Sequence, residues 1–168
     1  MRYAPAALAL SLVVAVTASA GQGAAAQPDP RAAALVAEGR SQLASGQPAA
    51  AVDSFEAALA IDPGYTAVYL ELGEAARAQG LQGKAIHYYR EALDRDSKNL
   101  AALSGEGEAM LEKGAVEKAK RNLAHLKSLC GASCAETKQL AAEIDAGPPK
   151  QPVLTADAVS PDPLVTQN

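Results

Sequence analysis

The sequence contains few aromatic residues and few cysteines. Among its 168 residues there is no tryptophan, one phenylalanine and a single pair of cysteines, Cys130 and Cys134. The formal net charge of −4 argues against electrostatic binding to nucleic acid or to anionic lipid. The sequence also lacks a glycine-rich phosphate loop and a nucleophile elbow. We therefore predict a protein that is not an enzyme, binds no cofactor and holds no metal ion.

Long apolar runs are also lacking, apart from one near the start of the chain. Residues 6–16 are apolar except for Ser11, follow the basic residue Arg2 and precede the small residues 18–20. This order is typical of an export signal, and a helix of eleven residues crosses only about half of a bilayer core. We expect residues 1–20 to be a signal peptide, and cleavage after residue 26 is the alternative site. An uncleaved anchor is the alternative. After cleavage we expect no stable membrane insertion and a periplasmic or secreted protein.

The central part of the chain repeats at an interval of 34 residues. Glycine recurs at this interval in two columns and alanine in a third, and larger or apolar residues form two more. The columns are Gly39, Gly73 and Gly107; Gly46, Gly80 and Gly114; Ala51, Ala85 and Ala119; Phe55, Tyr89 and Leu123; and Ala58, Ala92 and Leu126. Such a period is typical of stacked helical hairpins, in which a glycine with left-handed backbone ends the first helix. The sequence therefore predicts an all-α fold.

The repeated pattern resembles the tetratricopeptide repeat. The resemblance rests on Gly39, Gly46, Ala51, Phe55, Ala58 and Pro63 and on their counterparts Gly73, Gly80, Ala85, Tyr89 and Ala92. It covers residues 32–131 and implies a right-handed helical-hairpin solenoid of three repeats. The third repeat departs from the pattern, because Leu123 and Leu126 hold its large positions and Gly131 stands where a turn proline is expected.

The segments that flank the repeats have different patterns. Residues 27–31 contain two prolines and predict a linker. Residues 132–146 continue the 34-residue register with one apolar face, which predicts a C-terminal capping helix. Residues 147–168 contain five prolines and no helical period, which predicts a disordered tail. A tail segment that docks on a partner, or on the protein's own groove, is the alternative.

The two cysteines lie at the predicted junction between the third repeat and the capping helix. In an exported protein, Cys130 and Cys134 are expected to be oxidised, and a tight turn brings residues this close within bridging distance. We predict a structural disulfide that contributes roughly 2 kcal/mol before any strain is deducted. A reduced or labile pair is one alternative, and a redox or metal-handling module is another. We interpret His87 and His125 as surface residues and not as ligands.

The resemblance also implies that the first helices of the repeats line a concave groove. In such a groove a partner protein would lie as a peptide or a helix. The predicted partner-binding residues are Val36, Arg40, Leu43, Leu70, Glu74, Arg77, Glu108, Leu111 and Glu112. In this set the arginines are basic contacts near the first repeats and the glutamates are acidic contacts toward the third. That order would suit a ligand with its own charge polarity.

Some members of the family clamp the C-terminal carboxylate of a chaperone with lysine and asparagine residues. The matching positions here hold Val36, Arg40, Glu71, Ala101 and Gly105, of which only Arg40 is basic. We expect such a clamp to be absent. The sequence as a whole predicts a scaffold or adaptor in the cell envelope that binds another protein, with self-association as a further alternative.

Overall fold

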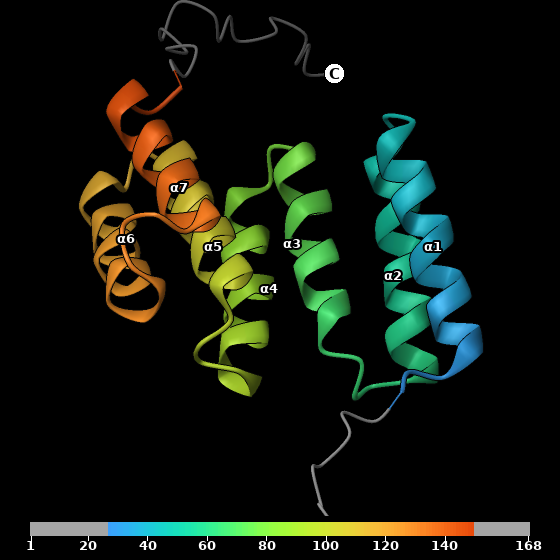
Figure 1. Cartoon of the computed structure of the whole chain (residues 1–168). Coiled ribbons are helices and arrows are strands. Elements are labelled where there is room, and N and C mark those ends of the chain that lie inside the picture. Colours follow the sequence, from blue (N-terminus) through green and yellow to red (C-terminus); the bar gives the residue numbers. More distant parts are fainter. Residues whose placement is uncertain (1–26, 150–168) are drawn as a thin grey trace, which may run out of the picture.

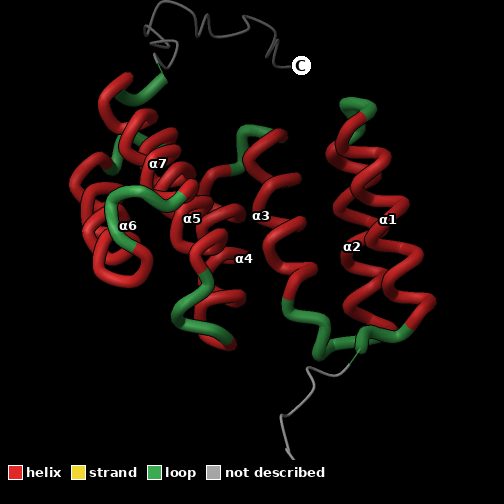
Figure 2. Tube along the Cα trace, in the orientation of Figure 1, coloured by secondary structure: helices red, strands yellow, loops and turns green. Residues whose placement is uncertain are grey.

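The computed structural model describes residues 27–149. The predicted signal peptide, residues 1–20, and nearly all of the predicted tail lie outside the described residues. Within them the chain forms seven helices and no strand (Figure 2). No helix of residues 27–149 combines the length and the apolar character needed to span a bilayer.

The helices pair in chain order into hairpins that stack side by side (Figure 1). The helices are α1 (Pro30–Ala44), α2 (Pro48–Ile61), α3 (Ala67–Ala78), α4 (Gln82–Arg95), α5 (Leu100–Glu112), α6 (Val116–Cys130) and α7 (Ala135–Ala146). The helices α1 and α2, α3 and α4, and α5 and α6 form three hairpins, and α7 packs against both α5 and α6. The predicted all-α solenoid of helical hairpins is confirmed.

The turn inside each hairpin is built around a glycine with positive φ. Gly46, Gly80 and Gly114 have φ values of 73°, 73° and 81°. In each turn the residue after the glycine donates its backbone N–H to a carbonyl in the last turn of the first helix; for example, Leu81 N donates to Ala76 O at 2.9 Å. This hydrogen bond helps to satisfy the carbonyl groups in the last turn of the first helix. The 34-residue glycine column therefore sets where each first helix ends.

The other glycine column allows large side chains to pack closely between helices. A Cβ atom at Gly39 would lie 2.5 Å from Phe55 Cε1, and one at Gly73 would lie 2.7 Å from Tyr89 Cε1. A ring thus fills the space beside a glycine in the first two hairpins. At Gly107 the nearest atom is Leu140 Cδ2, at 2.6 Å, so α7 supplies the side chain there.

Helix α7 covers the apolar end of the third hairpin. Leu140 has no exposed surface and lies in one core cluster with Leu103 and Leu126. Ile144 packs partly buried against the same cluster. Burial of this apolar face against α5 and α6 holds the last helix in place.

Two segment boundaries in the structure differ from those predicted from the sequence. Helix α1 begins at Pro30, so the last two residues of the predicted linker 27–31 belong to it. Proline fits the first helical position because its missing N–H would have no helical partner there, and Asp29 caps the helix by accepting from Arg31 N at 2.8 Å. Helix α7 begins at Ala135, three residues after the start of the predicted cap 132–146.

Candidate functional site

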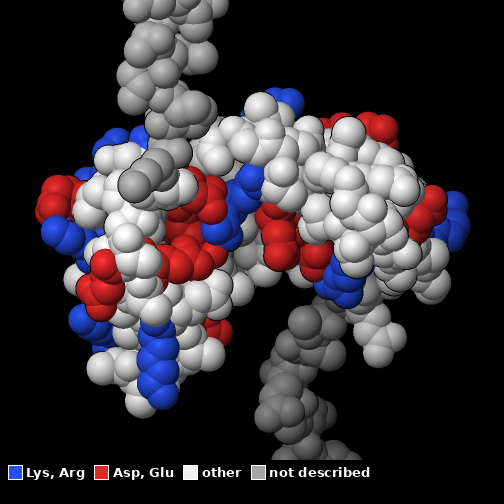
Figure 3. Space-filling view, turned by 90° about the horizontal axis from the view of Figure 1, so that it is seen from above, with Lys and Arg blue, Asp and Glu red and all other residues white. Residues whose placement is uncertain are grey.

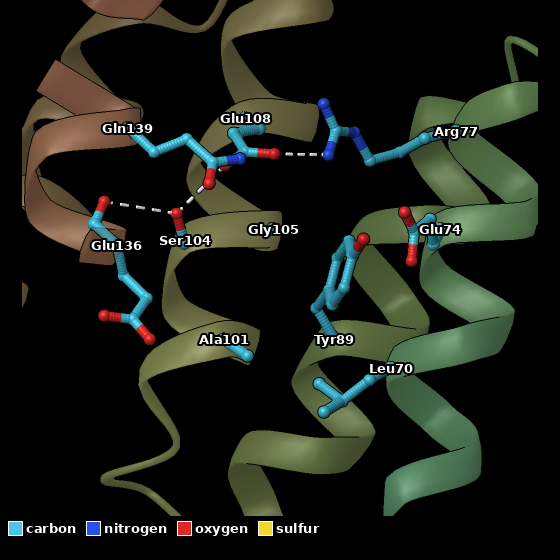
Figure 4. Close-up of a pocket in the computed structure, with 10 residues that line it drawn as sticks. All are labelled: Leu70, Glu74, Arg77, Tyr89, Ala101, Ser104, Gly105, Glu108, Glu136 and Gln139. Atoms are coloured by element: carbon cyan, nitrogen blue, oxygen red, sulfur yellow. Dashed lines mark hydrogen bonds and ion pairs between the residues drawn. The ribbon is translucent and has the colours of Figure 1, made fainter. Parts of the chain in front are cut away.

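A hollow of about 310 Å³ opens between α3, α5 and α7, with the ring of Tyr89 from α4 at its base (Figure 4). Its lining combines small or apolar residues with charged and amide side chains. The lining residues are Leu70, Glu74, Arg77, Tyr89, Ala101, Ser104, Gly105, Glu108, Glu136 and Gln139. First helices of two successive repeats and the C-terminal helix therefore contribute to one surface.

Arg77 is the central charge of this hollow. Its guanidinium forms ion pairs with Glu108 and Glu112 of α5; Nε donates to Glu112 Oε1 at 3.1 Å and Nη2 to the same oxygen at 2.5 Å. Burial lowers the pKa of the Arg77 guanidinium, but the hydrogen bond to Glu112 and the charges of both glutamates outweigh this effect and raise it. Arg77 is therefore a charged link between α3 and α5.

Glu108 extends this link to α7. One carboxylate oxygen of Glu108 pairs with Arg77, and the other accepts from Ser104 Oγ and from Gln139 Nε2, each at 2.9 Å. The Glu108 side chain is only 4% exposed, and a buried carboxylate needs such partners to offset its lost hydration. The network fixes the positions of α3, α5 and α7 around the hollow.

Tyr89 closes the base of the hollow. A Cβ atom at Gly105 would lie 2.5 Å from Tyr89 Cε1, and Gly73 approaches the same ring from α3. The ring is thus held between two glycines on neighbouring first helices. Burial raises the pKa of the Tyr89 hydroxyl to about 12, with Arg77 acting in the opposite direction, so the hydroxyl stays neutral at physiological pH.

A second ion pair lies on α1 and α3, away from the hollow. Arg40 Nε donates to Glu71 Oε1 at 2.9 Å and Nη2 donates to the same atom at 2.5 Å. The Arg40 side chain is 56% exposed. The hydrogen bond to Glu71 raises the pKa of the Arg40 guanidinium. Across the middle of the face seen in Figure 3, acidic and basic side chains lie close together.

The sequence model of the tetratricopeptide repeat matches residues 36–99 and 70–119, which together span half of the chain. The chain belongs to the tetratricopeptide repeat family. This confirms the family that the glycine and alanine columns indicated. No match was found among the curated proteins.

Solved structures of other tetratricopeptide repeat proteins have the same fold. The Sgt2 domain from Aspergillus fumigatus is 25% identical with a TM-score of 0.62, over 75% of this chain and 90% of that one. The Yersinia enterocolitica type III secretion chaperone SycD, in complex with a peptide of the translocator YopD, is 26% identical with a TM-score of 0.59, over 68% and 86%. The second such domain of human RPAP3, in complex with an HSP70 peptide, is 16% identical with a TM-score of 0.61, over 68% and 95%.

The structure brings part of the predicted partner-binding set together. Leu70, Glu74, Arg77 and Glu108 line the hollow, and Glu112 joins them through Arg77. The 34-residue register was sufficient to place these residues on one surface. The first helices of successive repeats lie side by side, so their equivalent positions are neighbours.

Four other predicted residues lie elsewhere. Val36 is 2% exposed and Leu111 is 3% exposed, each within a core cluster, so their prediction as partner contacts is corrected. They face inward because each packs among the apolar residues of its own core cluster, whereas Leu70 and Arg77, the residues one repeat away from them, line the hollow. Leu43 packs partly buried against the first core cluster, and Arg40 pairs with Glu71.

Sequence reasoning did not place Tyr89, Glu136 or Gln139 at the hollow. Tyr89 belongs to a repeated column of large side chains, and its ring packs against Gly73 and Gly105 and also forms the base of the hollow. Glu136 and Gln139 lie on the predicted capping helix, for which the sequence indicated only one apolar face. Their spacing of three residues, which places them on one helix face, was the available signal.

Cys130 is the last residue of α6, and Cys134 is the residue before α7. The Cα atoms of Cys130 and Cys134 are 5.9 Å apart, within the range that a disulfide spans. Thr137 Oγ1 lies 2.9 Å from Cys134 Sγ. A carboxylate oxygen of Glu136 and the two sulfur atoms lie within 4.8 Å of one another, and within the described residues this is the one such group of three donors that could hold a metal ion.

Proposed function

We propose that this tetratricopeptide repeat protein is a scaffold of the cell envelope that holds a segment of another protein, as a peptide or a helix, against α3, α5 and α7. The observation that carries the proposal is the hollow on these helices. Its walls are held by the Arg77–Glu108 network, so the surface is formed before a partner arrives. A preformed surface binds at lower entropic cost than one that must be ordered on binding.

The relatives of known structure support this proposal. SycD was solved with a peptide of the translocator YopD, and the RPAP3 domain was solved with a peptide of HSP70. SycD is 26% identical to this chain, over two thirds of it. A relative of this chain with the same fold therefore binds a segment of another protein. We propose no catalytic activity for the scaffold.

The proposed place in the cell envelope rests on the sequence. Residues 1–20 have the order of an export signal, with a short apolar run before small residues. In an exported protein, Cys130 and Cys134 would form a disulfide that ties α7 to α6, and their Cα separation of 5.9 Å supports this. Fractionation of cells that express the full chain, followed by mass determination of the N-terminus, would test both export and the cleavage site.

A metal-handling or redox module is the second candidate function. The observation in its favour is the group of Cys130, Cys134 and Glu136, whose donor atoms lie within 4.8 Å of one another. Native mass spectrometry of the exported protein separates the two functions. A mass about 2 Da below that of the thiol form, with no bound metal, would support the disulfide and the scaffold. A retained metal ion would support the second candidate.

Site-specific crosslinking would test the scaffold. A photoreactive amino acid placed at Ala101, which is exposed in the hollow, should crosslink to another protein in intact cells. The same amino acid at Lys127, exposed on α6, is the matched control. Crosslinked products of equal yield from both positions, or from neither, would contradict the proposal.

A further inference from the structure

The positive charge in the hollow is already paired with carboxylates of the same chain. Arg77 donates hydrogen bonds to Glu112 and pairs with Glu108, and both glutamates belong to the adjacent helix α5. Arg40, the other predicted basic contact, pairs in the same way with Glu71. The sequence suggested a groove that is basic at one end. In the structure both arginines are neutralised by carboxylates of their own chain.

Two further carboxylates stand on opposite walls of the hollow. Glu74 projects from α3 and Glu136 from α7, with the hollow between them (Figure 4). Within residues 27–149 neither carboxylate takes part in an ion pair with a lysine, an arginine or a histidine. Glu74 is exposed and Glu136 is half-buried, so a ligand in the hollow can approach both.

A third carboxylate adds to this charge. Glu143 lies seven residues beyond Glu136, on the same side of α7. Burial raises the pKa of the Glu143 carboxyl, the charges of Glu108 and Glu112 raise it further, and Arg77 lowers it. Glu143 therefore interacts with the charges of the Arg77 network. Because three glutamates and one arginine line the hollow, its surface carries a net negative charge.

Between the acidic walls the hollow has an apolar base. Leu70 of α3 and Ala101 of α5 lie at its lower end in Figure 4, beside the ring of Tyr89. Leu70 is half-buried and Ala101 is exposed, so both leave room for a small apolar side chain. A ligand that fits this surface must present an apolar group to Leu70 and Ala101 and a positive charge to Glu74 and Glu136.

We infer that the groove selects a cationic segment of its partner protein, in which a lysine or arginine side chain lies between Glu74 and Glu136 and a small apolar side chain packs on Leu70 and Ala101. The inference rests on the proposed function and names the partner's chemistry. Opposite charge across an interface raises the association rate and excludes segments of the wrong sign. An acidic segment would be repelled, because the one arginine of the hollow is already paired.

An unbiased selection tests this inference. A phage library of random 12-residue peptides is panned against the full chain, against the double variant Glu74→Gln/Glu136→Gln, and against the control Asp53→Asn/Asp94→Asn. The control removes the same charge from exposed positions on α2 and α4. Thermal unfolding of each protein confirms that all three are folded before panning.

The expected result is enrichment of lysine and arginine beside small apolar residues in peptides selected on the wild type and on the control. Peptides made from that pool should bind the double variant about tenfold more weakly, and this difference should shrink as salt rises. The charge inference would be overturned if the selected peptides were neutral or acidic and bound the hollow. Loss of their binding in the variant Ala101→Trp would show that they bind there, and the proposed scaffold function would then still stand. Selection of no peptide by any of the proteins would overturn both.

Discussion

Arg77 on α3 and Glu108 on α5 form an ion pair between two successive hairpins. They lie 31 residues apart in the sequence, and both side chains are largely buried, with 20% and 4% of their surface exposed. Because Glu108 also accepts from Gln139 of α7, one carboxylate joins three helices. The pair is therefore part of the frame of the proposed binding surface and is not a free contact for a partner.

Removal of Arg77 should destabilise the fold strongly. In Arg77→Ala the carboxylate of Glu108 would stay buried without its counter-charge, which typically costs about 3–5 kcal/mol. Arg40→Ala removes an arginine that is 56% exposed and should cost less than about 1 kcal/mol. Urea unfolding of both variants measures the difference. Equal losses of unfolding free energy would contradict the role assigned to the Arg77 network.

Close packing at Gly105 predicts a second difference in stability. In Gly105→Ala the new Cβ would lie 2.5 Å from Tyr89 Cε1, so the ring or the helix must move, at about 1–3 kcal/mol. Gly83→Ala in α4 is the matched control, because no atom would lie within 4 Å of its Cβ. We expect that control to be neutral or slightly stabilising, since alanine favours helix. Thermal unfolding compares the two, and a Gly105→Ala variant as stable as Gly83→Ala would show that Tyr89 is not tightly packed.

The proposed disulfide predicts a stability change that depends on redox conditions. Under oxidising conditions Cys130→Ser should lose about 2 kcal/mol, because the bridge restricts the unfolded chain over a short loop. With reductant present, the wild type should fall to about the stability of the variant. The change is measured by the thermal midpoint of both proteins with and without dithiothreitol. An unchanged midpoint under oxidising conditions would rule out a structural disulfide.

The raised pKa of Glu143 predicts that the stability of the fold depends on pH. Burial, together with the charges of Glu108 and Glu112, raises the pKa of the Glu143 carboxyl above the ordinary value of 4.5. The folded chain therefore binds this proton more tightly than the unfolded chain does, so the contribution of Glu143 is favourable below pH 4.5 and is lost as pH rises through the raised pKa.

Glu143→Gln should accordingly be more stable than the wild type at pH 7, by less than about 0.5 kcal/mol, and should show no gain at pH 3. Asp94→Asn, an exposed carboxylate on α4, controls for the loss of one charge. Chemical unfolding at both pH values gives the comparison. A gain at pH 3 that equals the gain at pH 7 would mean that the charge of Glu143 is not the cause.

The sequence by itself was enough to establish the repeat architecture. The 34-residue columns of glycine and alanine mark the helix ends and the close helix contacts, and both depend on local backbone conformation or on side-chain size. The same register placed Leu70, Glu74, Arg77 and Glu108 on one surface, because equivalent positions of stacked first helices face the same way.

The tertiary structure decided which of these residues a partner can reach. Val36 and Leu111 are buried in core clusters, although Leu70 and Arg77, the residues one repeat away from them, line the hollow. The pairing of Arg77 with Glu108 and Glu112 depends on the distance between α3 and α5, which no local pattern specifies. The acidic character of the hollow follows from this pairing and from the position of α7, which brings Glu136 opposite Glu74. Local sequence determines the helices and their turns, whereas the charge of the binding surface results from contacts between residues that lie far apart in the chain.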